Sequence, residues 1–349
     1  MRLAHFVSFG LGGADRNALN ILSGLKAAGC TSLIFYNQFS IPKVMPGIHN
    51  NGYEPLSRQR QFEEVAECIK IEHFSDIYKY GIDILHTHRS GEDKWLIPGF
   101  DSVTHPFKII ETNFHGSKTT KADIRVYPNK ALCHTKRIVL DYENRIIPNA
   151  ILPPLSSENL RAELGMENKF VFGRIARPDS DIYCSVNLEA YSRIENENTV
   201  FLYVAPHEYA KQDAVRFGIK NMVWLDPQLD SSRISTIYNT FDVLLHSNSA
   251  GETFGNTIAE AMMHGKPVVS HTGSHTWPQA HIELFGQYDR FVVRGQDIGE
   301  YSSLMKELML DRQLADTAGN YYKERSLNTY SVKRVASQYA EIYREISNV

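Results

Sequence analysis

The stretch that decides the fold is residues 241–270, which read FDVLLHSNSAGETFGNTIAEAMMHGKPVVS. It begins with a short apolar segment, Val243 to His246, that is typical of a buried β-strand. A polar loop follows, and a helical pattern opens at Phe254 and continues through Met262. A second apolar segment spans Pro267 to Ser270. Strand, loop, helix and strand in this order predict a parallel βαβ unit.

The same alternation extends outward in both directions. Three more strands are predicted in the second half of the chain: Phe170–Gly173, Val200–Ala205 and Met222–Leu225. Four are predicted in the first half: Leu3–Phe9, Ser32–Tyr36, Ile82–Thr87 and Phe107–Thr112. Apolar residues at helical spacing predict helices from residue 18 to Gly29 and over Phe62–Tyr80. Alternating strands and helices predict an α/β protein with mainly parallel sheets covered on both faces.

Length and a composition break predict two domains. A chain of 349 residues is longer than a single hydrophobic core usually supports. Residues 146–157, IIPNAILPPLSS, contain three prolines and have the composition of a linker. We therefore predict one α/β domain over residues 1–150 and a second over 151–330. The remainder, residues 331–349, has an amphipathic helical pattern over Val332–Ile346.

Composition and charge exclude several classes of protein. Hydrophobic residues make up 42% and charged residues 22%, as in ordinary globular proteins rather than disordered ones. The net charge of −3 gives no overall positive field, so nucleic acid is not an expected partner. Basic residues do gather between His115 and Arg145, which indicates either a solvated surface or peripheral contact with an anionic acceptor or a membrane. They are Lys118, Lys121, Arg125, Lys130, Lys136, Arg137 and Arg145.

Cysteine usage and the chain's N-terminal residues predict a cytoplasmic protein. The four cysteines are scattered, with no spacing that suits zinc or a disulfide framework. Residues 1–10 lead directly into a predicted strand without the features of a signal peptide. No apolar stretch reaches the roughly 18 residues of a membrane span. We expect a cytoplasmic location, with the inner face of the membrane as an additional possibility.

The loop and helix start inside residues 241–270 carry the chemistry. The first turn of a helix has backbone N–H groups without internal partners, so it can bind a diphosphate without a metal ion. Gly255 lets the backbone approach such a ligand closely. Glu252 precedes the helix and Glu260 lies inside it, so both carboxylates can accept hydrogen bonds from sugar hydroxyls. Taken singly, each glutamate is more typical of a solvated surface charge.

Glu252 and Glu260 are separated by seven residues and followed by AMMHGKPVVS, and this pattern resembles the E-x7-E signature of the family-4 retaining glycosyltransferases. Three more segments are similar to that family. They are the glycine-pair loop Gly12, Gly13, Ala14, Asp15 and Arg16, the run Phe172–Arg174, and His115 in ETNFHGS. The resemblance covers about Leu3 to Pro267, and its most specific motif surrounds Glu252.

The resemblance implies the GT-B fold, in which two Rossmann-like domains with parallel sheets face each other across a cleft. It implies that residues 1–150 are the acceptor side, that residues 151–330 bind the nucleotide sugar, and that residues 331–349 pack back on the first domain. The catalytic residues that it implies are Glu252, His115 and Arg174. The donor-binding residues would be Gly12, Gly13, Arg174, Arg177, Phe254, Gly255, Asn256, Thr257 and Glu260. Loops of the first domain supply acceptor candidates, namely His88, Arg89 and Lys118.

In this reading Glu260 binds the ribose and Glu252 holds sugar hydroxyls, while Arg174 neutralises the leaving diphosphate. One departure concerns the lysine that the family usually places a few residues after the arginine. Here the segment reads RIARPDSDI from Arg174, and no lysine follows. Arg177 is a permanently charged substitute that binds phosphate in a fork. The other possibility is weakened donor turnover, or none.

Three local patterns favour other chemistry less strongly. Asp179, Ser180 and Asp181 spell a D-x-D triplet of the kind that holds a divalent cation, but short matches are common by chance. His86 and His88 would point the same way from a strand, although the sequence offers no evident third ligand. The glycines from Gly10 begin like a dinucleotide fingerprint, but Asp15 occupies the last glycine position, which disfavours a nicotinamide cofactor.

The function that the resemblance implies is a metal-independent, retaining hexosyl transfer from a nucleoside-diphosphate sugar. The acceptor would be a hydroxyl group of a glycan or glycolipid, in glycan, polysaccharide or glycolipid biosynthesis. No cofactor is expected beyond the nucleotide-sugar co-substrate, and no metal site is predicted. Two alternatives stay open: a catalytically silent nucleotide-sugar sensor or subunit, and an epimerase-like enzyme of the same architecture.

Overall fold

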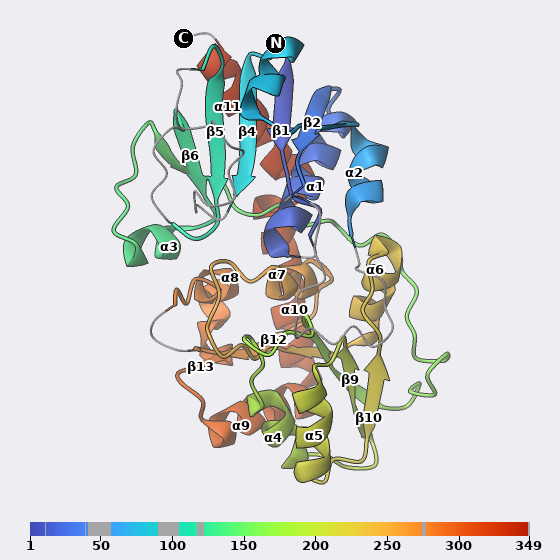
Figure 1. Ribbon diagram of the computed structural model, residues 1–349. Helices are drawn as coiled ribbons and strands as arrows, with labels where there is room; N and C mark the ends of the chain where they lie inside the picture. Colours follow the sequence, from blue (N-terminus) through green and yellow to red (C-terminus); the bar gives the residue numbers. More distant parts are fainter. Residues whose placement is uncertain are drawn as a thin grey trace. The chain divides into compact units, whose positions relative to one another are not determined.

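The computed structural model describes residues 1–10, 12–38, 40, 57–89, 105–116, 122–273 and 277–347. The chain forms two compact units. Unit 1 comprises Met1–Ala150 together with Thr329–Val349, and unit 2 comprises Ile151–Asn328. Each unit is built on its own sheet (Figure 1).

Unit 1 contains a seven-stranded sheet in the order β3-β2-β1-β4-β5-β6-β7, and every strand pairs parallel to its neighbour. Its strands are β1 (Leu3–Phe6), β2 (Ser32–Tyr36), β3 (Glu67–Lys70), β4 (Ile84–Arg89), β5 (Lys108–Asn113), β6 (Ile124–Tyr127) and β7 (Asn144–Ile146). Its helices are α1 (Gly13–Ala27), α2 (Gln59–Val65), the 3-10 helix η1 (Phe74–Tyr80), α3 (Lys130–Thr135) and α11 (Val332–Ser347). The predicted strand at 32–36 is confirmed to the residue, and α1 ends beside Gly29, whose φ is +80°.

The last helix of the chain, α11, packs on the first helix of unit 1 (Figure 1). A Cβ atom on Gly24 of α1 would lie only 2.7 Å from side-chain atoms of Ala336 and Val332. The two backbones can approach this closely only because Gly24 has no side chain. The apolar stripe of α11, which includes Tyr339 and Tyr343, is buried in unit 1.

The predicted single helix over Phe62–Tyr80 is wrong. The structure instead places α2, β3 and η1 in this segment. The helix ends at Val65 because Ala66 has an extended backbone, with φ −153° and ψ 165°. Residues 67–70 then pair with Leu33–Tyr36 of β2. The hydrogen bonds of an edge strand outweigh the helical spacing of the apolar residues, which the sequence pattern alone cannot weigh.

Unit 2 contains a six-stranded parallel sheet in the order β10-β9-β8-β11-β12-β13. Its strands are β8 (Phe170–Ile175), β9 (Thr199–Val204), β10 (Met222–Leu225), β11 (Val243–Leu245), β12 (Val268–His271) and β13 (Val292–Val293). Its helices are α4 (Val186–Ser192), α5 (Glu208–Arg216), α6 (Ser231–Thr240), α7 (Asn256–Met263), α8 (Ile282–Phe285), α9 (Ile298–Leu310) and α10 (Arg312–Thr329), with the 3-10 helix η3 (Gly286–Phe291). The βαβ unit predicted over residues 241–270 is confirmed as β11, α7 and β12.

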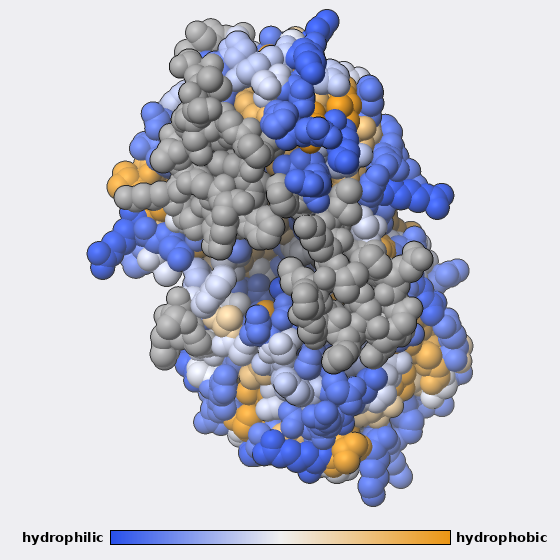
Figure 2. All heavy atoms as spheres, viewed as in Figure 1, coloured by the Kyte–Doolittle hydropathy of each residue, from blue (hydrophilic) through white to orange (hydrophobic). Residues whose placement is uncertain are grey.

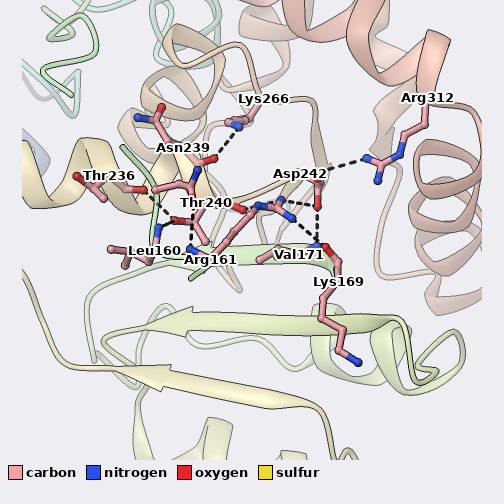
Figure 3. Close-up of polar contacts among 11 residues, drawn as sticks. Leu160, Arg161, Lys169, Val171, Thr236, Asn239, Thr240, Asp242, Lys266 and Arg312 are labelled. Carbon is pink, nitrogen blue, oxygen red and sulfur yellow. Dashed lines mark hydrogen bonds and ion pairs between the residues drawn. The ribbon is translucent and has the colours of Figure 1, made fainter. Parts of the chain in front are cut away.

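Asp242 secures the amino end of the central strands of unit 2 (Figure 3). Its Oδ2 accepts hydrogen bonds from the Val171 amide and from Nη2 of Arg161, both at 2.7 Å. Arg161 also donates to the carbonyl oxygens of Lys169 and Thr240. Arg312 adds an ion pair with Asp242 at 3.3 Å. Ligand binding is expected at the opposite, carboxyl edge, where α/β sheets bind their ligands.

Among the described residues, no helix has the length and apolar composition needed to cross a bilayer. On the face seen in Figure 2, the hydrophobic residues form small separate groups among hydrophilic ones.

Candidate functional site

Several of the predicted groups lie on elements at the carboxyl edge of the sheet in unit 2. Arg174 lies on β8, which pairs with β11. The loop after β11 carries Ser247 and Glu252, and α7 begins a few residues later. The carboxyl edge of a parallel sheet is where α/β proteins bind their ligands.

The guanidinium group of Arg174 is buried and held in a fixed orientation. The residue is 3% exposed. Its Nε donates to the hydroxyl of Tyr203 at 2.9 Å, and its Nη1 donates to Oγ of Ser247 at 2.8 Å. Ser247 in turn donates to the carbonyl oxygen of Cys184. Within the described part of the chain, no carboxylate forms an ion pair with Arg174.

Glu252 is fixed by two side-chain donors on one oxygen. Its Oε1 lies 3.1 Å from Nε2 of His246 and accepts a hydrogen bond from Nδ2 of Asn248 at 3.0 Å. Burial by itself raises the pKa of the Glu252 carboxyl, but His246 and Asn248 outweigh it, so the pKa lies below its usual value. The carboxylate is therefore ionised at neutral pH and acts as a hydrogen-bond acceptor.

The backbone around Glu252 depends on two glycines with positive φ. Gly251 has φ +96°, and a Cβ there would lie 2.8 Å from the carbonyl oxygen of Pro278. This close approach lets Glu252 exchange backbone hydrogen bonds with Pro278 and Ala280. Gly255 has φ +97° and forms the N-cap of α7, with no side chain capping the helix. The amino end of α7 therefore follows the loop of Glu252 directly, with a glycine at the N-cap position.

Glu260 lies inside α7 and is 9% exposed. The hydroxyl of Tyr238, on α6, donates to its Oε2 at 2.7 Å. Phe254 is buried, while Asn256 and Thr257 form the first turn of α7 and are partly exposed. Glu252 therefore belongs to the loop before α7, whereas Glu260 belongs to the second turn of the helix.

Arg177, unlike Arg174, is exposed. It follows the end of β8, its side chain is 53% exposed, and it pairs with Asp179 at 3.6 Å. Asp179 also accepts a hydrogen bond from the amide of Asp181, so the D-x-D triplet stabilises its own turn. Among the described residues, the only side chains close enough together to hold a metal ion are in unit 1, and they do not include this triplet.

The glycine loop of unit 1 lies at the start of α1. Gly12 is the N-cap and Gly13 is the first helical residue. The carboxylate of Asp15 lies against this loop. A Cβ atom added to Gly10 would be only 2.6 Å from Oδ2 of Asp15. Burial raises the pKa of Asp15 to about 6, against the lowering effect of the Ser8 hydroxyl and of Arg58. An acidic group thus accompanies the amides that were predicted to face donor phosphates.

The remaining predicted site residues of unit 1 have different environments. His115 is half-buried and follows β5. His88 is 6% exposed, and its ring stacks on that of His5. Arg89 ends β4, and Lys118 lies outside the described residues. Of the basic residues proposed to contact an anionic surface, Arg125 and Arg145 form ion pairs with Glu143 and Glu345.

The structure adds a third histidine to the pair on β4. His5 of β1 is in register with His86, and its Nδ1 lies 3.0 Å from Nε2 of His88. Ring nitrogens of the three residues lie within 4.8 Å of one another. Burial lowers the pKa of all three, so they are neutral. Both nitrogens of His86 are hydrogen-bonded, to the hydroxyls of Tyr343 and Thr112, which makes the group part of the packing of α11.

Several residues of the site in unit 2 were not predicted from the sequence. His246, Ser247, Tyr203 and Tyr238 each hold one of the predicted groups in place. The only available signal was that His246 and Ser247 end a buried strand just before the polar loop. Tyr203 and Tyr238 had the appearance of core aromatics, and their hydroxyl partners come from distant parts of the chain.

Part of the sequence and the fold match known proteins. Residues 170–311 match the family described as Glycosyl transferases group 1. No curated protein sequence matches the chain. Among solved structures, Anabaena Alr3699/HepE in complex with UDP and glucose is 16% identical, with a TM-score of 0.73 over 99% of this chain and 100% of that chain. A glycosyltransferase from Rickettsia africae ESF-5 is 17% identical, with a TM-score of 0.75 over 99% and 98% of the two chains.

A third structure, the sucrose-phosphate synthase from Thermosynechococcus elongatus, is 15% identical, with a TM-score of 0.71 over 99% of both chains. At such low identity these likenesses establish the fold and leave the substrates open. They confirm the two-sheet α/β architecture predicted from the sequence. The chain therefore has the GT-B fold, and its residues 170–311 match the family of group 1 glycosyltransferases.

Proposed function

We propose that this protein is a retaining glycosyltransferase that moves a hexose from a UDP-sugar to a hydroxyl group of a glycan or glycolipid without a metal ion. The observation that carries the proposal is the buried guanidinium of Arg174, which has no carboxylate counterion among the described residues. Burying an unpaired charge is costly, so such a group is typical of a site whose counterion arrives with the ligand.

A diphosphate supplies the missing negative charge. Arg174 can bind it through charge-assisted hydrogen bonds, and the first-turn amides of α7 add the positive end of the helix dipole. Both groups stabilise the charge that develops on the leaving nucleotide, which is the main catalytic contribution in this proposal. UDP is the favoured nucleotide because the similar Anabaena Alr3699/HepE was solved with UDP-glucose.

The two glutamates bind the hydroxyl groups of the donor. Glu260, held by Tyr238, accepts hydrogen bonds from the ribose. Glu252, ionised and held by His246, accepts hydrogen bonds from the hexose. In unit 1, the resemblance assigns the Gly12 and Gly13 amides to the donor, His115 to the transferred sugar, and His88, Arg89 and Lys118 to the acceptor. Arg177 replaces the family's usual lysine.

The proposed reaction retains the anomeric configuration. The bond between C1 of the hexose and the β-phosphate oxygen breaks, and the acceptor oxygen forms a bond to C1 on the same face. The acceptor proton passes to the departing phosphate oxygen, so the products are UDP and the glycosylated acceptor. No enzymatic nucleophile is required in this scheme, and Arg174 with the amides of α7 stabilises the leaving group throughout.

The test begins with calorimetric titration of the full-length chain with UDP, GDP and ADP. Arg174→Ala and Glu260→Gln should each weaken UDP binding at least about tenfold, because each removes a charge or acceptor from the nucleotide site. Matched controls are Arg312→Ala, at the amino edge of the same sheet, and Glu307→Gln, on the exposed part of α9. Unchanged binding in both site variants would refute the site.

Turnover distinguishes the remaining alternatives. UDP release from UDP-glucose and other UDP-hexoses should persist in the presence of a chelator and should increase with a hydroxyl acceptor. Nucleotide binding without transfer or hydrolysis would favour a silent sensor, for which the missing lysine is the main support. A different outcome is conversion of the donor to free UDP or to an epimer, at a rate that an acceptor does not increase. This result would favour the epimerase-like enzyme.

A further inference from the structure

His246 is a residue of the second unit to which neither the E-x7-E motif nor the fold assigns a role. It follows β11 directly, and its side chain is only 8% exposed. Its two ring nitrogens have different partners. Nε2 lies 3.1 Å from Oε1 of Glu252, and Nδ1 lies 3.0 Å from Oγ of Ser270 on β12.

We propose that His246, held as its Nε2–H tautomer by Ser270, is the positioning residue that orients Glu252 so that Oε2 alone faces the donor sugar. The proposal rests on the function proposed above for Glu252. It also specifies how one side of the hexose is recognised, through a single carboxylate oxygen in a fixed direction.

The tautomer follows from the hydrogen-bonding capacity of the partners. An ionised carboxylate accepts hydrogen bonds and donates none, so Nε2 of His246 must carry the proton that faces Glu252. In the neutral ring Nδ1 is then an acceptor, and the Ser270 hydroxyl is the group that can donate to it. Ser270 is fully buried, so its hydroxyl has no competing contact with bulk water.

The backbone of His246 is immobilised by its neighbours. Its amide donates to the carbonyl oxygen of Val269 at 2.8 Å. The hydroxyl oxygen of Tyr301, from α9, lies 3.0 Å from the carbonyl oxygens of both His246 and Val269 and can donate its proton to either. The imidazole therefore extends from a rigid strand end into the loop of Glu252, and it can transmit that rigidity to the carboxylate.

The two oxygens of Glu252 are used unequally. Oε1 contacts both His246 and Asn248, whereas Oε2 has no hydrogen-bond partner among the described residues. With Oε1 occupied, rotation of the carboxylate would break two hydrogen bonds. The free oxygen is thus held in one direction, which is what recognition of a particular sugar hydroxyl requires.

The decisive experiment compares two substitutions that keep different parts of the imidazole. His246→Gln places an amide N–H near the position of Nε2 and retains the donor to Glu252. The side chain in His246→Asn is shorter. Its amide reaches only the position of Nδ1, so the donor to Glu252 is lost. We expect kcat with the UDP-hexose to fall roughly 10- to 100-fold in His246→Asn and to recover most of that loss in His246→Gln. Affinity for UDP alone should stay within about twofold in both, because UDP lacks the sugar.

Two spectroscopic measurements are independent of turnover. Long-range ¹H–¹⁵N spectra of the wild type should give the pattern of an Nε2-protonated imidazole for His246, and Ser270→Ala should lose that single tautomer. The ¹³C signal of the Glu252 carboxyl, assigned with Glu252→Gln, should titrate at higher pH in His246→Asn than in the wild type and His246→Gln.

The outcomes separate this proposal from the function on which it rests. If no nucleotide sugar is turned over by the wild type, the proposed function fails, but the tautomer and the Glu252 titration still decide whether His246 orients the carboxylate. An Nδ1-protonated His246, or equal kcat losses in the Asn and Gln variants with unchanged Glu252 titration, would overturn the positioning role.

Discussion

The hydroxyl of Tyr343 lies 2.6 Å from Nδ1 of His86, although the two residues are 257 positions apart in the chain. Tyr343 is on α11, the last helix, and His86 is on β4, near the middle of the first sheet. Both side chains are buried. This contact joins the end of the chain to the unit in which the chain begins.

Removing that hydroxyl should destabilise unit 1. Tyr343→Phe leaves Nδ1 of the buried His86 without its partner, and an unsatisfied buried polar group costs about 1–3 kcal/mol. Tyr142→Phe removes the hydroxyl of an exposed tyrosine of the same unit and should be neutral within about 0.5 kcal/mol. Urea unfolding at neutral pH measures both changes. Equal stability of the two variants would mean that the contact contributes nothing.

Arg174 should affect stability and binding in opposite directions. Arg174→Met removes a buried charge that has no counterion among the described residues, so we expect the nucleotide-free variant to be at least as stable as the wild type. UDP should raise the melting temperature of the wild type and not that of the variant. The matched variant is Arg161→Met, which breaks the ion pair with Asp242 and should be destabilised. A loss above about 2 kcal/mol in Arg174→Met would identify Arg174 as mainly structural.

Gly251 should be sensitive to a single methyl group. Gly251→Ala places a Cβ 2.8 Å from the carbonyl oxygen of Pro278 at a φ of +96°. Gly295 has a similar φ of +83°, but a Cβ added there would have no atom within 4 Å. Gly295→Ala therefore measures the cost of the backbone conformation alone, about 1–2 kcal/mol. The variant at 251 should lose more stability than that at 295 and should also lose donor turnover. Thermal melts and UDP release measure the two effects, and equal losses of stability would exclude the steric explanation.

Asp15 should make unit 1 less stable as the pH rises. Its pKa is raised to about 6, so the native state keeps a proton that the unfolded chain releases near pH 4. The free energy of unfolding therefore falls between about pH 4 and pH 6, and the full penalty is present at neutral pH.

Asp15→Asn removes that penalty. Relative to the wild type, it should gain stability at pH 7.5 and show little gain at pH 4. Glu341→Gln, an exposed change on α11 of the same unit, should give no pH-dependent difference. Urea titrations at the two pH values make the comparison. A gain of the same size at both would exclude titration of Asp15 as the cause.

The sequence by itself determined the α/β architecture and the local form of the proposed donor loop. β2 and β10 are short apolar runs between polar residues, so both could be predicted to the residue. The start of α7 beside Gly255 was also predictable, because it depends on residues that are adjacent in the chain. The segment at Phe62–Tyr80 was mispredicted because β3 gains its hydrogen bonds from β2, which is distant in sequence.

Only the tertiary structure decided which side chains meet. Sheet register places His5 beside His86, and the adjacency of β8 and β11 brings Arg174 to Ser247. The hydrogen bond from His246 to Glu252 depends on the course of a loop fixed by Pro278 and Ala280. Periodicity along a chain reflects neighbours a few residues apart, whereas the partner of a buried polar group is set by packing between distant segments. The chemical groups of the candidate site could therefore be predicted, while their partners and protonation could not.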